Sequence, residues 1–171
     1  MEHAAASLTR HAEDVTGWAQ SKNLQVSTSK STVTLFTPEF QQSHLHPNVP
    51  LNGTTLPLDR NPKILGVTFD PHLKFHKHIE SIVNRAKPRL NILKLLTGTD
   101  WGQQKETIMA TFKSLVGSIL TYANPVWFPN TSETSISRLQ VIQNSALRIA
   151  TGCVRMTPID HLHAETKILK V

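Results

Sequence analysis

Apolar residues recur at helical spacing through the second half of the chain. The longest stripe runs from Ile79 to Leu96 and predicts a helix that begins near His76 and stops near Gly98. Pro88 lies in the middle of this stripe and should kink or split the helix. Three further stretches carry the same spacing: Ile108 to Leu120, Ile136 to Ile149, and Ile159 to about Leu169. Helices joined by short turns predict a small bundle.

The helix around Ile136 to Ile149 has recognisable ends. Ser132 or Thr134 can serve as its N-cap, since a hydroxyl oxygen there accepts hydrogen bonds from the first backbone N–H groups. Gly152 should stop this helix, and Pro125 should keep the preceding one from continuing.

The first half of the chain mixes helical and strand-like patterns. Small and apolar side chains between His3 and Ala19, including Leu8 and Val15, recur at helical spacing and predict a helix. Two short apolar runs, Leu24 to Ser27 and Val33 to Phe36, predict strands separated by a polar turn. The stretch from Thr37 to Asn61 is rich in proline, and Asn52-Gly53 within it predicts a small hairpin.

A short run of β-branched and apolar residues follows from Ile64 to Phe69. The run predicts a strand buried on at least one face, in which Gly66 marks a bulge or the close approach of another backbone. Asp70-Pro71 should end the strand, because proline cannot donate to a ladder and aspartate favours turns. We expect this strand to close the small sheet of the first half.

These patterns predict an α+β fold class, with a small antiparallel sheet followed by an α-helical bundle. The chain has 171 residues, and its 39% hydrophobic content is enough for a globular core in one or two small domains. The start of the continuous helical pattern places the boundary between residues 1–75 and residues 76–171.

Positive charge gathers in one part of the chain. Between Arg60 and Lys113 there are ten Lys or Arg residues and four acidic residues, whereas eight bases and eight acids cancel elsewhere. The whole net charge of +6 therefore lies in this region. Phosphates are natural partners for such a region through salt-sensitive contacts, although a solvated helix face explains the same pattern.

Motifs along the chain, taken in order, resemble one protein family. They are Leu96-x-Gly98-x-x-Trp101-Gly102, Leu120-x-Tyr122-Ala123-x-Pro125-x-Trp127, Leu139-x-x-x-Gln143-Asn144-x-Ala146-Leu147-Arg148 with Thr151-Gly152, and Thr157-Pro158 before Leu162-x-x-Glu165. A helix ending near Trp18 and the run at Ile64 precede them in the same order. The chain thus resembles the end of the palm and the thumb of reverse transcriptases from non-LTR retrotransposons. Each motif also has a structural explanation: Gln143, Asn144 and Arg148, for example, can cap neighbouring carbonyls instead of reading nucleic acid.

The resemblance implies roles for particular residues. Leu65, Gly66 and Val67 correspond to the primer grip, a hairpin that holds the 3′ end of the primer. Lys30 corresponds to a palm lysine that assists proton transfer near the leaving pyrophosphate. Phosphate contacts would come from Lys74, Lys77, Arg85, Lys87 and Arg89. Residues 1–75 would then be a palm remnant with the primer-grip hairpin, and residues 76–171 the thumb and its C-terminal extension.

The catalytic carboxylates of such a polymerase have no counterpart in this sequence. Nucleotide transfer places two divalent metal ions between palm aspartates, two of which come from a Tyr-x-Asp-Asp turn. The aspartates of this chain are Asp14, Asp59, Asp70, Asp100 and Asp160, with no adjacent pair. We therefore expect that the chain begins after the catalytic turn, has no catalytic residue, and is inactive alone. The two magnesium ions are expected only in the intact polymerase.

Other chemistry has less support in the sequence. The histidines His44 and His46, His72 to His78, and His161 and His163 could share an ion, but no cysteine or carboxylate cluster completes a metal site. Cys153 is the single cysteine and has no sequence cue to a base. There is no glycine-rich phosphate loop, and we expect no small-molecule substrate.

The location expected from the sequence is intracellular, in the nucleus or the cytoplasm, and not secreted. One cysteine excludes an intrachain disulfide, and the residues after Met1 lack the basic and apolar regions of a signal peptide. No apolar run approaches the about 20 residues of a membrane span.

Hypotheses of different classes remain open for the function. The first is a C-terminal fragment of an RNA-directed DNA polymerase that at most holds primer and template, with an RNA/DNA duplex and the missing N-terminal polymerase half as partners. The second is a non-catalytic, basic nucleic-acid-binding module recruited from such an element. The third is a helical protein-interaction module whose basic face is incidental.

Overall fold

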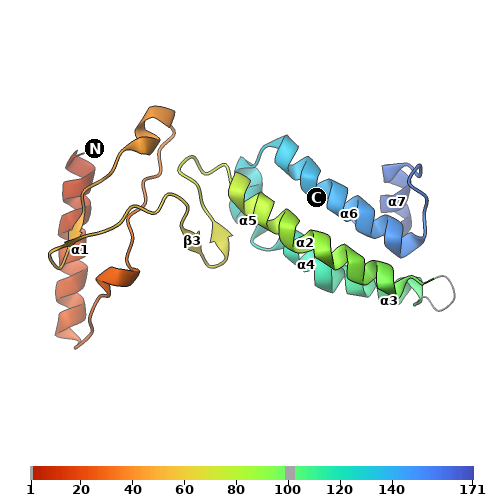
Figure 1. Ribbon diagram of the computed structural model, residues 1–171, viewed down its shortest axis with the longest axis horizontal. Coiled ribbons are helices and arrows are strands. Elements are labelled where there is room, and N and C mark those ends of the chain that lie inside the picture. The colour runs from red at the N-terminus through yellow and green to blue at the C-terminus, as the bar shows by residue number, and fades with distance from the viewer. Residues whose placement is uncertain (1, 99–102) are drawn as a thin grey trace. The chain divides into compact units, whose positions relative to one another are not determined.

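The computed structural model describes residues 2–98 and 103–171 (Figure 1). The chain divides into two compact units, Met1–Leu73 and Lys74–Val171. Two-stranded antiparallel sheets lie in the first unit and most helices in the second, which confirms the predicted α+β class. Asp100, Trp101 and Gly102, which enter the predictions above, lie outside the described residues.

The first unit consists of one long helix and short, mostly irregular segments. Its elements are α1 Glu2–Ser21, the 3-10 turns η1 Thr28–Lys30 and η2 Phe40–His44, and the strands β1 Pro50–Leu51, β2 Thr54–Thr55, β3 Lys63–Ile64 and β4 Val67–Thr68. Strands β1 and β2 form one hairpin, and β3 and β4 form another. The buried apolar side chains of this unit are Ala19, Val33, Val49, Leu51 and Val67, so its core is small.

Helix α1 packs on the rest of the first unit through small residues. Thr16 and Ala19 are buried, and the hydroxyl of Thr16 donates a hydrogen bond to the backbone oxygen of Ala12 at 2.8 Å. Leu8 and Val15, which the helical pattern placed on the apolar stripe, are exposed instead. The prediction of a helix was confirmed, and the side that it buries carries smaller residues than these two.

The two strands predicted early in the chain are absent from the described structure. Residues Leu24 to Ser27 lead into the 3-10 turn η1, and Val33 forms only an isolated parallel bridge with Leu58. An apolar run becomes a strand only where a partner strand pairs with it, and the described residues offer Val33 a single bridge. The Asn52-Gly53 hairpin was predicted correctly: Pro50 pairs with Thr55 and Leu51 with Thr54.

The second unit is an α-helical bundle. Its elements are α2 His76–Leu96, α3 Lys105–Phe112, the π-helical turn η3 Lys113–Gly117, α4 Ser118–Thr121, α5 Asn124–Trp127, the 3-10 turn η4 Phe128–Asn130, α6 Glu133–Thr151 and α7 Ile159–Thr166. Helices α2 and α6 lie side by side over much of their length, and α6 also contacts α3 and α7 (Figure 1). The core includes Ile79, Leu93, Trp127, Leu139 and Leu147.

The ends of these helices follow local chemistry in most cases. The Ser132 hydroxyl oxygen accepts a hydrogen bond from the backbone N–H of Ser135, and Gly152 ends α6 with a φ of 67°. Helix α7 ends at Thr166 rather than near Leu169, because Lys167 adopts a φ of 53°. Pro88 lies inside α2, which remains one helix, so the predicted split does not occur.

Candidate nucleic-acid interface

The segment at Ile64 is a tight hairpin and not a continuous strand. Lys63 pairs with Thr68 and Ile64 with Val67, which leaves Leu65 and Gly66 as a two-residue turn. Both have positive φ, 47° at Leu65 and 87° at Gly66, as in a type I′ turn. The predicted bulge at Gly66 and the closing of one small sheet were therefore wrong, because β3 and β4 pair only with each other.

The turn places a large apolar side chain in solvent. Leu65 is 87% exposed at the tip of the hairpin, whereas Val67 beside it is 4% exposed and belongs to the core. The expectation that Leu65 lies in a buried strand was therefore wrong. Of the three residues that resemble a primer grip, Leu65 and Gly66 form the tip, and Val67 anchors the hairpin to the unit.

A second hairpin in the same unit has the same backbone geometry. Its central residues are Asn52, with a φ of 49°, and Gly53, with a φ of 76°. Asn-Gly is the preferred pair for this turn, because asparagine tolerates the left-handed region and glycine has no Cβ. A leucine in the left-handed region costs roughly 1–2 kcal/mol. The local backbone therefore does not explain why a leucine stands at residue 65.

Lys30 ends the 3-10 turn η1. Its side chain is exposed, and its backbone N–H donates to the carbonyl oxygen of Ser27 at 3.3 Å. A backbone bond of Ser31 to Thr28 closes the same turn. The position leaves the ammonium group of Lys30 in solvent on the first unit.

The other predicted phosphate-binding residues lie on α2 or just before it. Lys74, Lys77, Arg85 and Lys87 are exposed, and Arg89 is half-buried. Arg85 and Arg89 are four residues apart and share one edge of the helix, while Lys87 shares the opposite edge with Lys94, seven residues on. The buried side of α2 lies between these edges. The helix thus presents two basic edges and not one basic face.

The residues Gln143 and Asn144 are buried in a hydrogen-bonded network between α6 and α7. The Gln140 amide donates to the side-chain oxygens of both, at 2.8 Å each. The His163 Nε2 lies 3.0 Å from the Asn144 amide oxygen. The ring also donates from Nδ1 to the backbone oxygen of Ile168 at 2.7 Å.

The same network holds the last described residues of the chain. Gln143 donates from its amide to the backbone oxygen of Leu169 at 2.9 Å, and the N–H of Val171 donates to the Gln140 side-chain oxygen at 2.9 Å. The buried amides are thus bound within the protein, which favours the structural explanation of this motif. Sequence reasoning missed Gln140 and His163 as members. The signal was the spacing of Gln140, Gln143 and Asn144 at i, i+3 and i+4 within an apolar helix.

Two further motif residues also have structural roles. Arg148 donates to the backbone oxygen of Thr157 at 3.3 Å and so holds the connection between α6 and α7. The indole N–H of the fully buried Trp127 donates to the backbone oxygen of Tyr122 at 2.8 Å. These contacts stabilise the bundle and involve no exposed surface at Trp127.

The described part of the chain holds no cluster of three or more His, Cys, Asp or Glu side chains able to bind a metal ion. Two of the histidines considered above have other partners: His72 donates to the Thr37 backbone oxygen at 2.8 Å, and His76 lies 3.3 Å from the Ser135 hydroxyl. Within the described ranges, no helix has both the length and the apolar character of a membrane span.

Acidic side chains in the second unit serve as ion-pair partners. A hydrogen bond from Lys105 and its positive charge hold the pKa of the Glu165 carboxyl below its usual 4.5. Lys170 lowers the pKa of the Asp160 carboxyl in the same way, and the Lys170 Nζ lies 2.7 Å from the Asp160 Oδ1. Both carboxylates lie at the surface, so they tie elements together rather than forming a reactive centre.

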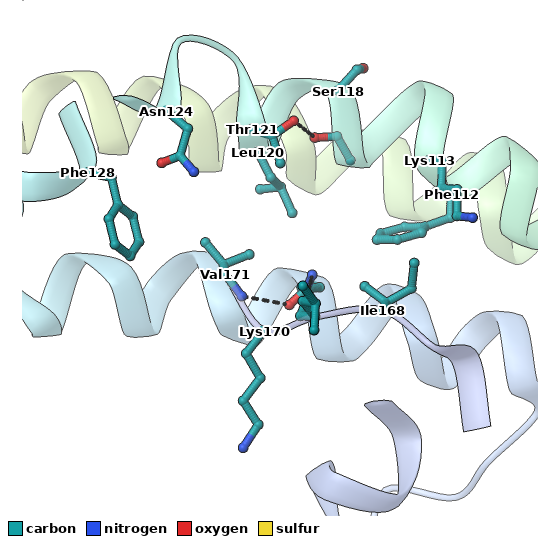
Figure 2. A pocket seen from close by; sticks show the side chains of 13 residues that line it. Phe112, Lys113, Ser118, Leu120, Thr121, Asn124, Phe128, Ile168, Lys170 and Val171 are labelled. Carbon is teal, nitrogen blue, oxygen red and sulfur yellow. Dashed lines mark hydrogen bonds between the residues drawn. The ribbon is translucent and has the colours of Figure 1, made fainter. Parts of the chain in front are cut away.

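An apolar pocket of the second unit lies beside the C-terminal residues (Figure 2). It has a volume of about 560 Å³, and its walls include Phe112, Leu120, Phe128 and Ile168. Figure 2 shows Val171 bound to an α6 amide on one side, with the segment α3 to α5 facing it across the pocket. Residues 168–171 are bonded to α6 and α7 and form one wall of this pocket.

Known proteins with similar sequences come from mobile elements. The chain is 26% identical, over 171 residues, to a probable RNA-directed DNA polymerase from transposon X-element of Drosophila melanogaster. This match covers 99% of this chain and 18% of that protein. It is 23% identical over 168 residues to the RNA-directed DNA polymerase from mobile element jockey of Drosophila funebris, covering 98% and 18% respectively.

A third relative is a probable RNA-directed DNA polymerase from transposon BS of Drosophila melanogaster, 26% identical over 150 residues. That match covers 88% of this chain and 16% of the relative. The chain thus spans less than a fifth of the length of these relatives. No family model and no solved structure matches it.

Proposed function

Since this chain is a relative of the RNA-directed DNA polymerases of non-LTR retrotransposons, we propose that it is the palm-and-thumb segment of a reverse transcriptase. In this proposal it holds a primer–template duplex and does not join nucleotides by itself. Residues 1–75 correspond to the end of the palm, and residues 76–171 to the thumb and its extension. The observation that carries the proposal is the sequence match over almost the whole chain.

The hairpin tip supports a role at the primer end. Leu65 is exposed and stands in a backbone conformation that leucine disfavours, and such outliers are retained where function requires them. An apolar side chain on a tight turn can pack against the sugar or base of a terminal nucleotide, while Gly66 lets the backbone approach closely. Val67 keeps the hairpin fixed to its unit.

The charge of α2 supports a role in holding the duplex. Arg85, Lys87 and Arg89 form no ion pair among the described residues, so their charges remain available for phosphates. The helix holds a single acidic residue, Glu80, against five Lys or Arg. Contacts of this kind release counterions and give binding that weakens steeply with salt. Lys74 and Lys77, near the start of α2, extend the proposed set.

The remaining parts of the reaction belong to the intact enzyme in this proposal. The two magnesium ions would be held by carboxylates outside this chain, in the N-terminal polymerase half, which is its protein partner. Lys30 would assist proton transfer near the pyrophosphate only when that half is present. The proposed site of action is intracellular, in the nucleus or the cytoplasm, because the substrate is nucleic acid.

Duplex binding and primer extension by the purified chain test the proposal. A labelled RNA/DNA hybrid should bind more tightly than either single strand, with an affinity that falls linearly on a log–log plot against salt. Magnesium and deoxynucleotides should give no extension of an annealed primer. Extension by the isolated chain would overturn the non-catalytic assignment. Equal affinity for duplex and single strands would overturn the duplex-holding role.

A further inference from the structure

Helix α1 carries an apolar stripe that the first unit does not cover. Leu8, Val15 and Trp18 are 46%, 56% and 61% exposed. They are separated by seven and three residues, a spacing that places them along one side of the helix. The packed side carries small residues, among them the half-buried Ala12 and the buried Thr16 and Ala19. The largest apolar side chains of α1 therefore lie in solvent.

The charged residues of α1 identify its solvent-facing side. Arg10, Glu13 and Asp14 are all exposed, and helical geometry places them away from both the packed side and the stripe. The helix thus has a polar face, a packed face of small residues, and an apolar stripe. A surface helix with a complete polar face does not need a second exposed face that includes a tryptophan.

The longer relatives indicate what covers the stripe. The matches to the X-element and jockey polymerases extend over nearly all of this chain and so include α1. More than four fifths of each relative lies outside the matched stretch. In those proteins the segment that matches α1 is covalently joined to the rest of the polypeptide, which is therefore present at high effective concentration.

We propose that Leu8, Val15 and Trp18 form the docking surface for the part of the polymerase that lies outside this chain. This inference rests on the proposed function and names the surface through which the two parts join. The occupant is an apolar protein surface with a recess for the indole of Trp18, since a large ring that fills a pocket typically dominates such contacts.

A second copy of the chain fits this stripe less well than a covalently linked partner. A stable interface buries roughly 800 Å² on each partner, which three side chains on one helix do not supply. Docking within one polypeptide avoids most of the entropy lost when separate molecules associate, and so needs less area. The stripe is therefore suited to contacts within a longer chain.

Hydrogen exchange in a chimeric polymerase tests this inference. This chain replaces the matched stretch of the X-element polymerase, and exchange of α1 amides is compared between the chimera and the isolated chain. We expect exchange in α1 to slow by about tenfold or more in the chimera. Trp18→Glu and Val15→Glu should each remove this protection. Leu95→Glu, at a residue 69% exposed on α2, is the matched control and should retain it.

Two further measurements separate the possible outcomes. Equal exchange in the chimera and the isolated chain would overturn the inference, and so would a dimer of the isolated chain that Trp18→Glu dissociates. Duplex affinity of the isolated chain is measured in parallel and should not change with Trp18→Glu. If duplex binding fails while α1 gains protection, the docking surface stands and the duplex-holding role does not.

Discussion

The Nε2 atom of His163 lies 3.0 Å from the side-chain oxygen of Asn144, and this contact joins α7 to α6. Both side chains are buried. Because the Ile168 carbonyl oxygen can only accept, the His163 Nδ1 carries the proton of that bond. The Nε2 atom also lies 3.2 Å from the amide nitrogen of Gln140. The contacts that join α6, α7 and the C-terminal residues thus depend on a few buried polar groups.

Removal of the Asn144 side chain should destabilise the second unit without affecting duplex binding. Asn144→Ala leaves the Gln140 amide without one of its acceptors inside the bundle, which costs about 1–3 kcal/mol in the free energy of unfolding. Urea titration measures this loss. Ser145→Ala is the control, because its hydroxyl bonds only to its own helix, and the change should stay within about 0.5 kcal/mol. A weaker affinity of folded Asn144→Ala for duplex would contradict the structural role.

Leu65→Asn should separate stability from primer holding. Asparagine suits the left-handed backbone at this position, as Asn52 does in the other hairpin, so the substitution should stabilise the chain by about 1 kcal/mol. It also removes the exposed apolar side chain, so affinity for a recessed primer end should fall while affinity for a blunt duplex stays. Competition between the two duplexes measures the difference. Unchanged preference for the recessed end would remove Leu65 from the proposed site.

The two basic edges of α2 can be compared directly. Arg85→Ala with Arg89→Ala removes two charges from one edge, and Lys87→Ala with Lys94→Ala removes two from the other. The proposed set includes both arginines of the first pair and only Lys87 of the second, so the first pair should lower the salt slope by about 2 and the second pair by about 1. Equal effects of both pairs would show that the helix acts only through its overall charge.

The extent to which the sequence predicts this structure varies with the range of the interactions. Asn52-Gly53, Ser132 and Gly152 were interpreted correctly, because each satisfies its own backbone through local chemistry. The turn at Leu65 was not, because leucine disfavours the left-handed backbone that this turn requires, and a single glycine in an apolar run equally indicates a bulge in a strand. Only the pairing of Ile64 with Val67 reveals the hairpin.

Interactions between distant residues account for the remaining differences. The face that α1 buries depends on which side contacts β1, and the apolar pattern alone favoured the larger residues Leu8 and Val15. His163 lies 19 residues from its partner Asn144, and the turn after α6 decides that they meet. The phosphate-binding and primer-grip assignments remain predictions, since they concern molecules that bind from outside.

Acid should weaken the contact between α3 and α7. The pKa of Glu165 is lowered on folding by the hydrogen bond from Lys105, so the ionised form stabilises the folded state. That contribution is present above the usual pKa of 4.5 and is lost as the pH falls through the lower folded value. Glu165→Gln should therefore lower the unfolding midpoint slightly at about pH 6, and this difference should shrink as the pH falls below 4.5. A difference that grows on acidification would contradict this sign.

Limited proteolysis should remove or loosen the first unit before the helices of the second. The first unit has a small buried core and two-residue strands, whereas the second buries residues such as Trp127, Leu139 and Leu162 completely. Segments with few buried contacts open at lower free energy. Mass spectrometry of early fragments should show cleavage within the first ~60 residues and an intact helical product. Equal protection of both units would contradict this prediction.

The π-helical turn η3 joins α3 to α4 and affects how this helical segment tolerates a change in its length. Phe112, Val116 and Leu120 are buried and spaced four residues apart. A π-helical turn takes in more residues than an α-helical one, so this spacing stays closer to a single line along the helix. A π-helical turn inside an α-helix takes up one extra residue, so loss of one residue from η3 would convert it to α-helix and leave the residues after it, including Leu120, in nearly the same orientation. A single-residue deletion is therefore tolerated better in this turn than in the regular part of a helix.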